Sequence, residues 1–397
     1  MHVMRRLFRV PLIFFFIAAC IGLLLRWHFV SPLPWIKFPY WLHTHSHMMF
    51  LGWVFNTLFL AYVSNYSLID KRYKSLFIAM QCLLCVMLIS FPLQGYGIVS
   101  IIFSTLHTIC VAVFCLWILK DFKKTKGSVS IDYGRISLIL FLISSLGPFT
   151  LGPLMAIGFG QTKWYYFAVY FYLHFQYNGV FIFGLFSLFY HEMEERGIQF
   201  NRVAAEKSKR LLWIAIFPTY FLSTLWADPG LLFNIIGFIG AIIQIISLYC
   251  FIQVIRPLKF EPTYPKNKVL LLIAFFSLIL KSILQLVSAH PQIAHLAFDI
   301  RSFIIAYLHL VLIGVITLFL LGWYIEKNVV EIKSSASIYF IVIGFVGSEL
   351  VMVLMGTSFF QFLSFTSPPV LLFLFSIVIV WGLGSFLLCS FRKIKNT

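Results

Sequence analysis

Long apolar runs, separated by short polar stretches, occupy most of the chain. Each run can cross the hydrocarbon core of a bilayer, which takes roughly 20 helical residues. We predict α-helices, because a lone helix satisfies its own backbone polar groups in lipid and the alternating pattern of a membrane barrel is absent. The predicted spans, about twelve in number, cover residues 8–26, 43–64, 75–93, 97–119, 136–157, 164–190, 211–227, 230–255, 268–288, 301–325, 336–356 and 369–391.

Composition supports an all-α integral membrane protein. Hydrophobic residues make up 61% of the 397 positions and charged residues 11%, against roughly 25% charged residues in a soluble domain. The longest polar stretches are 120–135, 191–210 and 256–268. None is long enough to fold alone, so residues 1–397 are predicted to form a single polytopic domain. We expect 191–210 to form a surface helix with a solvated His191.

The distribution of basic residues predicts the orientation. With a cytoplasmic N-terminus, 25 of the 30 Lys and Arg residues fall on the cytoplasmic side, as the positive-inside rule requires. The others are Arg26, Lys37, Lys163 and Arg301 outside, and Lys281 within a span. This predicts that both termini are cytoplasmic. We expect the membrane to be the bacterial inner membrane. The net charge of +17 reflects this topology. Because the basic residues form no basic domain, we expect no nucleic-acid partner.

Three histidines open the second span, in the stretch "WLHTHSHMMFLGW" at residues 41–53. His43 and His47 are four residues apart and share a helix face, whereas His45 points elsewhere. The cluster predicts a ligand for a metal or haem iron, with a wet interfacial entrance as the alternative for some of its members. The seven cysteines, by contrast, lie in apolar spans and indicate packing.

Further histidines lie at similar depth. His107 in the fourth span, His174 in the sixth and His309 in the tenth fall in the outer half of the membrane with the cluster. Ionisable residues in spans are rare and usually functional, and imidazole is a common ligand for haem iron and copper. The set therefore predicts haem or metal ligation, with interhelical hydrogen bonding as the alternative for His107. His47, His174 and His309 also each precede a glycine by five positions.

Two charged residues lie within spans. Lys281 in the ninth span and Glu349 in the eleventh have matching depths. Because a charge at mid-membrane is costly unless it is paired or hydrated, the two predict either an ion pair or a proton path from the cytoplasm. His290 and His295, in an outer loop, are expected to be exposed.

The number of spans and the positions of the histidines resemble those of a known protein family. Twelve spans with histidines on spans 2, 6 and 10 are similar to the catalytic subunit I of the haem–copper oxidases and the related nitric oxide reductases. "LHTHSHMMFLGW" is similar to the helix-2 stretch around the low-spin haem ligand, "LHFQYNGVFIF" to the helix-6 metal-ligand segment, and "YLHLVLIG" to helix 10. NnrS-like haem- and copper-containing membrane proteins also share a short His-rich motif and twelve spans.

The resemblance implies a low-spin haem b held between His309 and either His43 or His47. Arg301, at the outer mouth of the tenth span, is implied to hold a haem propionate. His174 is implied as a ligand of a second metal, copper or non-haem iron.

The chain also departs from the family's pattern. His107 is outside the pattern and offers an alternative ligand, as in a second haem. The family's histidine pair on helix 7 is missing from 211–227, and Tyr307 stands where the family has its high-spin haem ligand. Asn178 replaces the reductase glutamate of helix 6. The binuclear-centre motif is therefore incomplete, although tyrosine can itself ligate haem iron.

The function implied is electron transfer with reduction or sensing of a small gas, O2 or NO, by an oxidoreductase-like protein. Its electron donor is implied to be a cytochrome or quinol, and its surroundings are membrane lipid. Two alternatives remain. One is a cofactor-free proton-coupled transporter that uses Lys281, Glu349 and the histidines. The other is a non-catalytic partner of a respiratory complex.

Overall fold

The structure is a computed structural model that describes residues 6–66, 68, 70–123, 127–160, 162–258, 265–332, 334–361 and 367–391. The predicted cytoplasmic termini end in residues 1–5 and 392–397, which lie outside the described residues. The helical elements are α2 (Arg9–Val30), α3 (Phe38–His47), η1 (Met48–Phe55), α4 (Asn56–Asn65), α5 (Lys71–Gln94), α6 (Ile98–Phe122), α7 (Val129–Ser144), α8 (Leu146–Ala156), α9 (Lys163–His174), η2 (Phe175–Phe181), α10 (Ile182–Glu195), α11 (Arg202–Ala215), η3 (Pro218–Ala227), α12 (Leu231–Ile255), α13 (Pro265–Val287), α14 (Pro291–Asp299), α15 (Arg301–His309), η4 (Leu310–Thr317), α16 (Leu318–Glu326), α17 (Ala336–Met355), η5 (Ser358–Gln361) and α18 (Pro368–Ser390).

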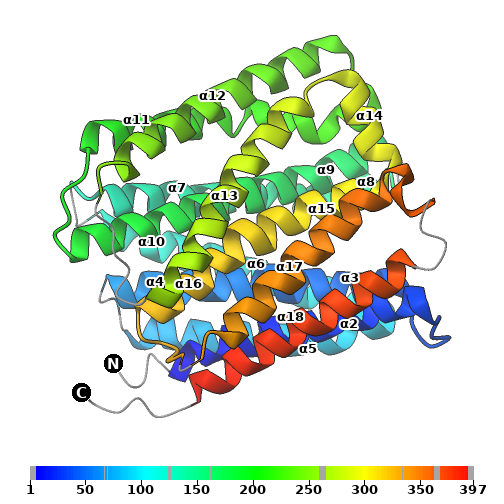
Figure 1. Ribbon diagram of the computed structural model, residues 1–397, viewed down its shortest axis with the longest axis horizontal. Helices are drawn as coiled ribbons and strands as arrows, with labels where there is room; N and C mark the ends of the chain where they lie inside the picture. The colour runs from blue at the N-terminus through cyan, green and yellow to red at the C-terminus, as the bar shows by residue number, and fades with distance from the viewer. Residues whose placement is uncertain are drawn as a thin grey trace. The chain divides into compact units, whose positions relative to one another are not determined.

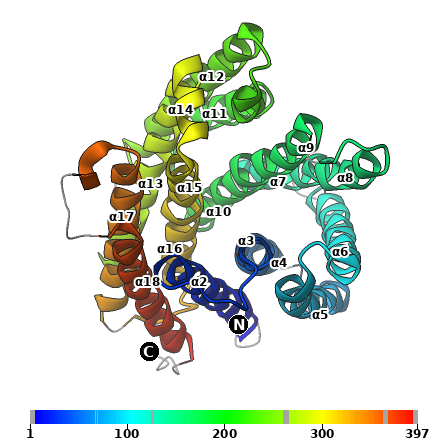
Figure 2. The ribbon, with the colours of Figure 1, turned by 90° about the vertical axis from the view of Figure 1, so that its right-hand side faces the viewer.

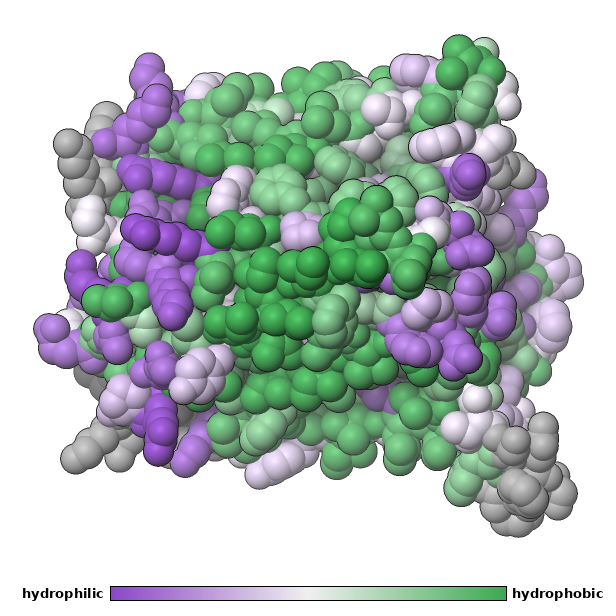
Figure 3. All heavy atoms as spheres, turned by 90° about the horizontal axis from the view of Figure 1, so that it is seen from above, coloured by the Kyte–Doolittle hydropathy of each residue, from purple (hydrophilic) through white to green (hydrophobic). Residues whose placement is uncertain are grey.

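Eleven helical segments among the described residues are long and hydrophobic enough to cross a membrane, which confirms an all-α integral membrane protein (Figure 1). In Figure 3, hydrophobic residues cover the middle of the face in view, and hydrophilic residues gather toward its left and right sides. The segments are Arg9–Val30, Phe38–Asn65, Lys71–Gln94, Ile98–Phe122, Val129–Ala156, Arg202–Ala227, Leu231–Ile255, Asn267–Val287, Arg301–Glu326, Ala336–Met355 and Pro368–Ser390.

The remaining predicted span, 164–190, is helical as well. α9, η2 and α10 continue one another without a break from Lys163 to Glu195. This segment carries the buried side chains of His174, Gln176 and Asn178, which lower its hydropathy. We call the helices 38–65, 163–195 and 301–326 helix 2, helix 6 and helix 10.

Contacts divide the chain into two compact units. Unit 1 comprises Met1–Phe114, Pro262–Ala274 and Thr317–Thr397, and unit 2 comprises Cys115–Glu261 and Phe275–Ile316. Three of the four boundaries fall within α6, α13 and helix 10, and the fourth, at 261/262, lies outside the described residues. The prediction of a single domain stays a prediction.

Helix 2 lies at the core of unit 1, with 89% of its most hydrophobic window buried. The ring of Trp53 stacks on Phe15 of α2 with centroids 4.8 Å apart, and its Nε1 donates a hydrogen bond of 3.0 Å to Thr317 Oγ1. α2, α18 and α17 lie side by side in the same unit (Figure 2). Buried aromatic surface of this kind accounts for much of the packing free energy of a helical core.

Unit 2 pairs α7 with α10 and η2, α8 with α9, and α11 with α12. Serine hydroxyls join some of these helices: Ser137 Oγ donates to the carbonyl oxygen of Val180 at 2.7 Å, and Ser187 Oγ to that of Ser130 at 2.8 Å. Hydrogen bonds between helices satisfy polar groups that lipid cannot.

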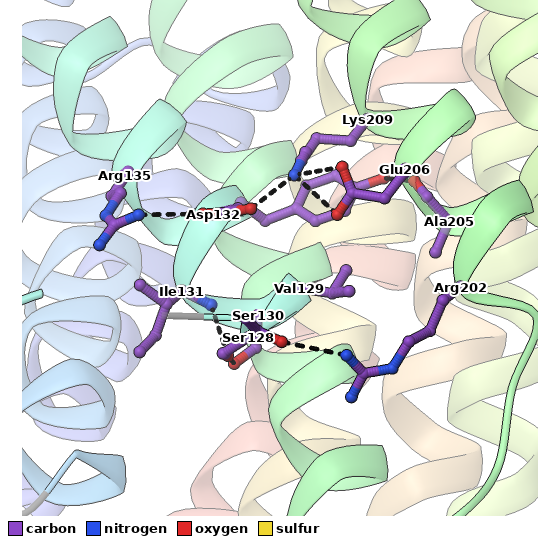
Figure 4. A network of polar contacts seen from close by, with 12 residues as sticks. Ser128, Val129, Ser130, Ile131, Asp132, Arg135, Arg202, Ala205, Glu206 and Lys209 are labelled. Atoms are coloured by element: carbon purple, nitrogen blue, oxygen red, sulfur yellow. Dashed lines mark hydrogen bonds and ion pairs between the residues drawn. The ribbon is translucent and has the colours of Figure 1, made fainter. Parts of the chain in front are cut away.

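The start of α7 is held by polar contacts (Figure 4). Ser128 caps the helix by accepting a hydrogen bond from the backbone N–H of Ile131 at 3.2 Å. Lys209 of α11 donates to Asp132 of α7 at 2.7 Å and to Glu206 at 2.9 Å. This network ties α7 to α11.

The prediction of one surface helix over 191–210 is wrong. α10 continues to Glu195, the chain turns at Gly197, and α11 begins at Arg202. Gly197 has φ 65°, a left-handed conformation that glycine adopts without steric cost. The His191 side chain is only 12% exposed, so it is not solvated as predicted.

Candidate functional site

The His45 imidazole faces α2. Its Nδ1 lies 2.8 Å from the carbonyl oxygen of Ala18. Gly22, one turn further along α2, leaves room for the ring, because a Cβ at that position would lie 3.0 Å from His45 Cε1. The imidazole is therefore anchored and packed by a single neighbouring helix.

His43 and His47 face α5 and the turn that follows it. The His47 ring stacks on Phe91 with centroids 4.4 Å apart, and the His43 ring meets Tyr96 edge-on at 4.5 Å. His47 Nδ1 lies 2.8 Å from the carbonyl oxygen of His43. The prediction that His43 and His47 share a face while His45 points elsewhere is confirmed.

These hydrogen bonds fix the tautomers of His45 and His47. A carbonyl oxygen can only accept, so Nδ1 must carry the proton in both imidazoles. In a neutral ring the other nitrogen, Nε2, then holds a lone pair. Metal-bound histidines commonly have this arrangement, because a hydrogen bond from the second nitrogen orients the ring and raises its basicity. Both side chains can therefore coordinate through Nε2.

A π-helix follows the histidine in helices 2, 6 and 10. His47, His174 and His309 are the last residues of α3, α9 and α15, and η1, η2 and η4 begin at the next position. The glycine five positions later lies inside the π-helix each time. Because π-helices are rare and frequently occur at functional sites, the recurrence singles out these three histidines as candidate site residues.

His174 uses both ring nitrogens in unit 2. Its Nε2 donates to the carbonyl oxygen of Ile216 at 2.8 Å, and its Nδ1 accepts from Asn178 Nδ2 at 3.2 Å. The side chain is 1% exposed. A metal could bind His174 only after one of these bonds is released.

Unsatisfied polar atoms occur close to His174. Asn178 Oδ1 and the Tyr307 hydroxyl are buried without a hydrogen bond within the described residues, although the two side chains lie close together. Gln176 Oε1 is unsatisfied as well. The structure thus brings together His174 and Tyr307, two of the predicted metal ligands, around the Asn178 amide.

The intramembrane charges have different neighbours. Glu349 interacts electrostatically with Arg26 in unit 1, and Arg26 Nη2 lies 3.2 Å from Met352 Sδ. Lys281, 2% exposed in unit 2, interacts with His174. Sequence analysis missed Arg26 because α2 continues four residues beyond it, to Val30, so that Arg26 lies within the helix and not in the outer loop. The proton path stays a prediction.

The other predicted ligands are placed as follows. His107 of α6 is fully buried, Arg301 is the exposed first residue of α15, and His309 is its last. Among the described residues, no three His, Cys, Asp or Glu side chains come close enough together to hold a metal ion. A metal site built from these side chains in the described parts of the chain would therefore have at most two of them as ligands.

Comparison with known proteins supports the fold. No protein-family model and no curated protein matches the sequence. The structure is similar to a chain of a haem–copper terminal oxidase dimer solved by cryo-EM, with a TM-score of 0.71 and 13% identity over 100% of this chain and 85% of that chain. The chain is thus an integral membrane protein with the fold of a haem–copper terminal oxidase.

Proposed function

We propose that this chain binds a b-type haem and transfers electrons, and that it reduces or senses a small gas such as O2 or NO. The His45 imidazole carries the proposal, because Ala18 anchors its Nδ1 and leaves Nε2 for a metal. The oxidase fold supports the same function. A cytochrome or quinol would supply the electrons in a bacterial inner membrane.

In this proposal His45 and His309 would hold the haem. His45 precedes Trp53 by eight residues, His309 precedes Thr317 by eight, and Trp53 donates a hydrogen bond to Thr317. From the sequence, both histidines are predicted to lie in the outer half of the membrane. His43 and His47, which the sequence favoured, face α5 instead.

A haem bound at His45 would supply one-electron chemistry. Ala18 orients the imidazole, and Gly22 keeps space for it. The stacked rings of Phe15 and Trp53 would exclude water from the adjoining surface of helix 2, and this low dielectric would tune the potential of a bound iron. Arg301 is proposed to hold a propionate through a charge-assisted hydrogen bond.

The residues around His174 do not fit a second metal. Both ring nitrogens are already engaged, by Ile216 and Asn178. A three-ligand group is absent from the described parts of the chain. We therefore derive no step at a binuclear centre, and we favour electron transfer or gas sensing over oxygen reduction.

The test is a reduced-minus-oxidised optical spectrum of the purified chain, with a pyridine haemochrome assay. We expect a b-type spectrum that is lost in His45→Ala and His309→Ala and kept in His43→Ala. A wild-type protein without any Soret band would contradict the proposal.

A proton-coupled transporter without cofactor is the second candidate. Lys281 favours it, since a lysine that is 2% exposed at mid-membrane is costly and usually functional. Solute uptake by haem-free protein in vesicles, driven by a proton gradient and lost in Lys281→Met, would support this candidate against the first.

A further inference from the structure

His107 carries two buried nitrogen atoms that bond to nothing in the described structure. The side chain is 0% exposed, and neither Nδ1 nor Nε2 has a hydrogen-bond partner. A neutral imidazole has one donor and one acceptor, and leaving both unsatisfied in an apolar interior is costly. Native structures rarely keep such a group without a ligand, ion or water to satisfy it.

The helix face that carries His107 packs on helix 2. Phe114, seven residues later, lies on the same face of α6. Its ring stacks on Phe59 of α4 with centroids 3.9 Å apart and meets Phe55 of η1 at 6.0 Å. His107 therefore faces helix 2 about two turns away from this contact.

The depth of His107 matches that of His47. The turn before α6 packs on the start of α3, because a Cβ at Gly95 would lie 2.6 Å from the Tyr40 ring. His107 lies seven residues before Phe114, and His47 lies eight residues before Phe55, whose ring Phe114 contacts. The two imidazoles also interact electrostatically.

The geometry points to a metal site between the His107 and His47 imidazoles within unit 1, and we propose that it binds Cu(I). His47 Nε2 holds a lone pair, because Nδ1 donates to the carbonyl oxygen of His43. Either nitrogen of His107 can supply the second ligand, and the remaining one would keep its proton.

The choice of Cu(I) follows from the small number of ligands and the apolar surroundings. Zn²⁺ prefers four ligands in structural sites, and no third His, Cys, Asp or Glu joins this pair among the described residues. Cu(I) accepts two-coordinate geometry and suits imidazole. Its single charge also costs less to transfer from water into an apolar interior than a double charge does. The site is independent of the proposed haem, because His45 faces α2.

The experiment uses the purified full-length protein under anaerobic, reducing conditions. Cu(I) is titrated against a chelator of known affinity, bound copper is measured per polypeptide, and X-ray absorption reports the number of nitrogen ligands. The variants are His107→Leu and His47→Leu, with His295→Leu on the exposed α14 as the matched control. His107→Met keeps a soft ligand and tests whether coordination or mere burial matters. Haem content and monodispersity are measured on every sample.

We expect one Cu(I) per chain in wild type and His295→Leu, with two nitrogen ligands. Affinity should fall by at least about tenfold in His107→Leu and His47→Leu, and less in His107→Met. Equal copper binding by wild type and His107→Leu, or tighter binding of Zn²⁺ than of Cu(I), would overturn the proposal. A wild-type protein that binds no Cu(I) would also overturn the proposal, and a buried water would then satisfy the His107 nitrogens. Retained haem in His107→Leu separates this outcome from failure of the haem proposal.

Discussion

His45 and His174 are anchored alike but are prepared for different roles. Each bonds a backbone carbonyl oxygen at 2.8 Å, His45 that of Ala18 in α2 and His174 that of Ile216 in the turn after α11. The difference lies in the second nitrogen. His45 Nε2 has no hydrogen bond within the described residues, whereas His174 Nδ1 accepts one from Asn178. An imidazole with one nitrogen bonded is available as a ligand, and one with both bonded serves structure.

The largest effect on haem binding is expected from a substitution that removes the space for the His45 ring. In Gly22→Val the new side chain would occupy the position of His45 Cε1, 3.0 Å from the Cβ, and the imidazole would have to move. We expect haem per polypeptide to fall by about tenfold or more, since ligand orientation governs metal affinity. The control is Gly152→Val, whose Cβ meets nothing within 4 Å; equal haem loss there would contradict the assignment.

Removal of His174 should cost stability and leave haem unchanged. His174→Leu leaves the Asn178 amide unsatisfied in a buried position and leaves Thr219 as the one side-chain donor, among the described residues, to the Ile216 carbonyl oxygen. Each unsatisfied group costs about 1–3 kcal/mol, so the free energy of unfolding should fall by that order. Thermal unfolding in detergent measures the change, and the optical spectrum serves as the control. Loss of haem without loss of stability would make His174 a ligand after all.

A smaller effect is expected at Trp53, which shares the α2-facing side of helix 2 with His45. Trp53→Phe keeps the ring stacked on Phe15 but removes the hydrogen bond to Thr317. The expected loss is about 1 kcal/mol of unfolding free energy. If this bond holds helices 2 and 10 in register, the haem of Trp53→Phe should also dissociate faster in a transfer assay to apomyoglobin. An unchanged rate would show that the register does not depend on this bond.

The smallest effect is expected at the polar network that starts α7. Lys209→Met removes the contacts to Asp132 and Glu206, whose side chains are 38% and 35% exposed. Partly exposed pairs contribute about 0.2–1 kcal/mol, and Arg135 remains beside Asp132. Unfolding should shift slightly and haem content should not change. A large change in haem content would show that this polar network affects the haem site.

The spans could be predicted from sequence because hydropathy alone sets them. All twelve predicted spans overlap helical segments. The helices of the spans predicted at 136–157 and 211–227 begin earlier, at Val129 and Arg202, and each of these spans consists of two helical elements. The split of the cluster was also predictable, since side chains four apart on a helix share a face and those two apart do not. The glycine spacing after His47, His174 and His309 was a visible signal, although only the structure shows that it marks π-helices.

The partners of the histidines could not be predicted. The Ala18 carbonyl that holds His45 belongs to another helix, and nothing in its residue type distinguishes it from other backbone carbonyls. The same holds for Ile216 and His174. The residue pattern predicts the depth of each imidazole. The rotation of the helix decides which neighbour the ring faces, and thereby which of its nitrogens is hydrogen-bonded. The sequence favoured His43 or His47, whereas we propose His45, whose ring faces α2.

The most direct test compares haem per polypeptide in His43→Ala, His45→Ala and His47→Ala, each purified under the same conditions. The account predicts that His45→Ala loses its haem b spectrum while the other two keep theirs. Full haem in His45→Ala together with loss in His47→Ala would contradict it.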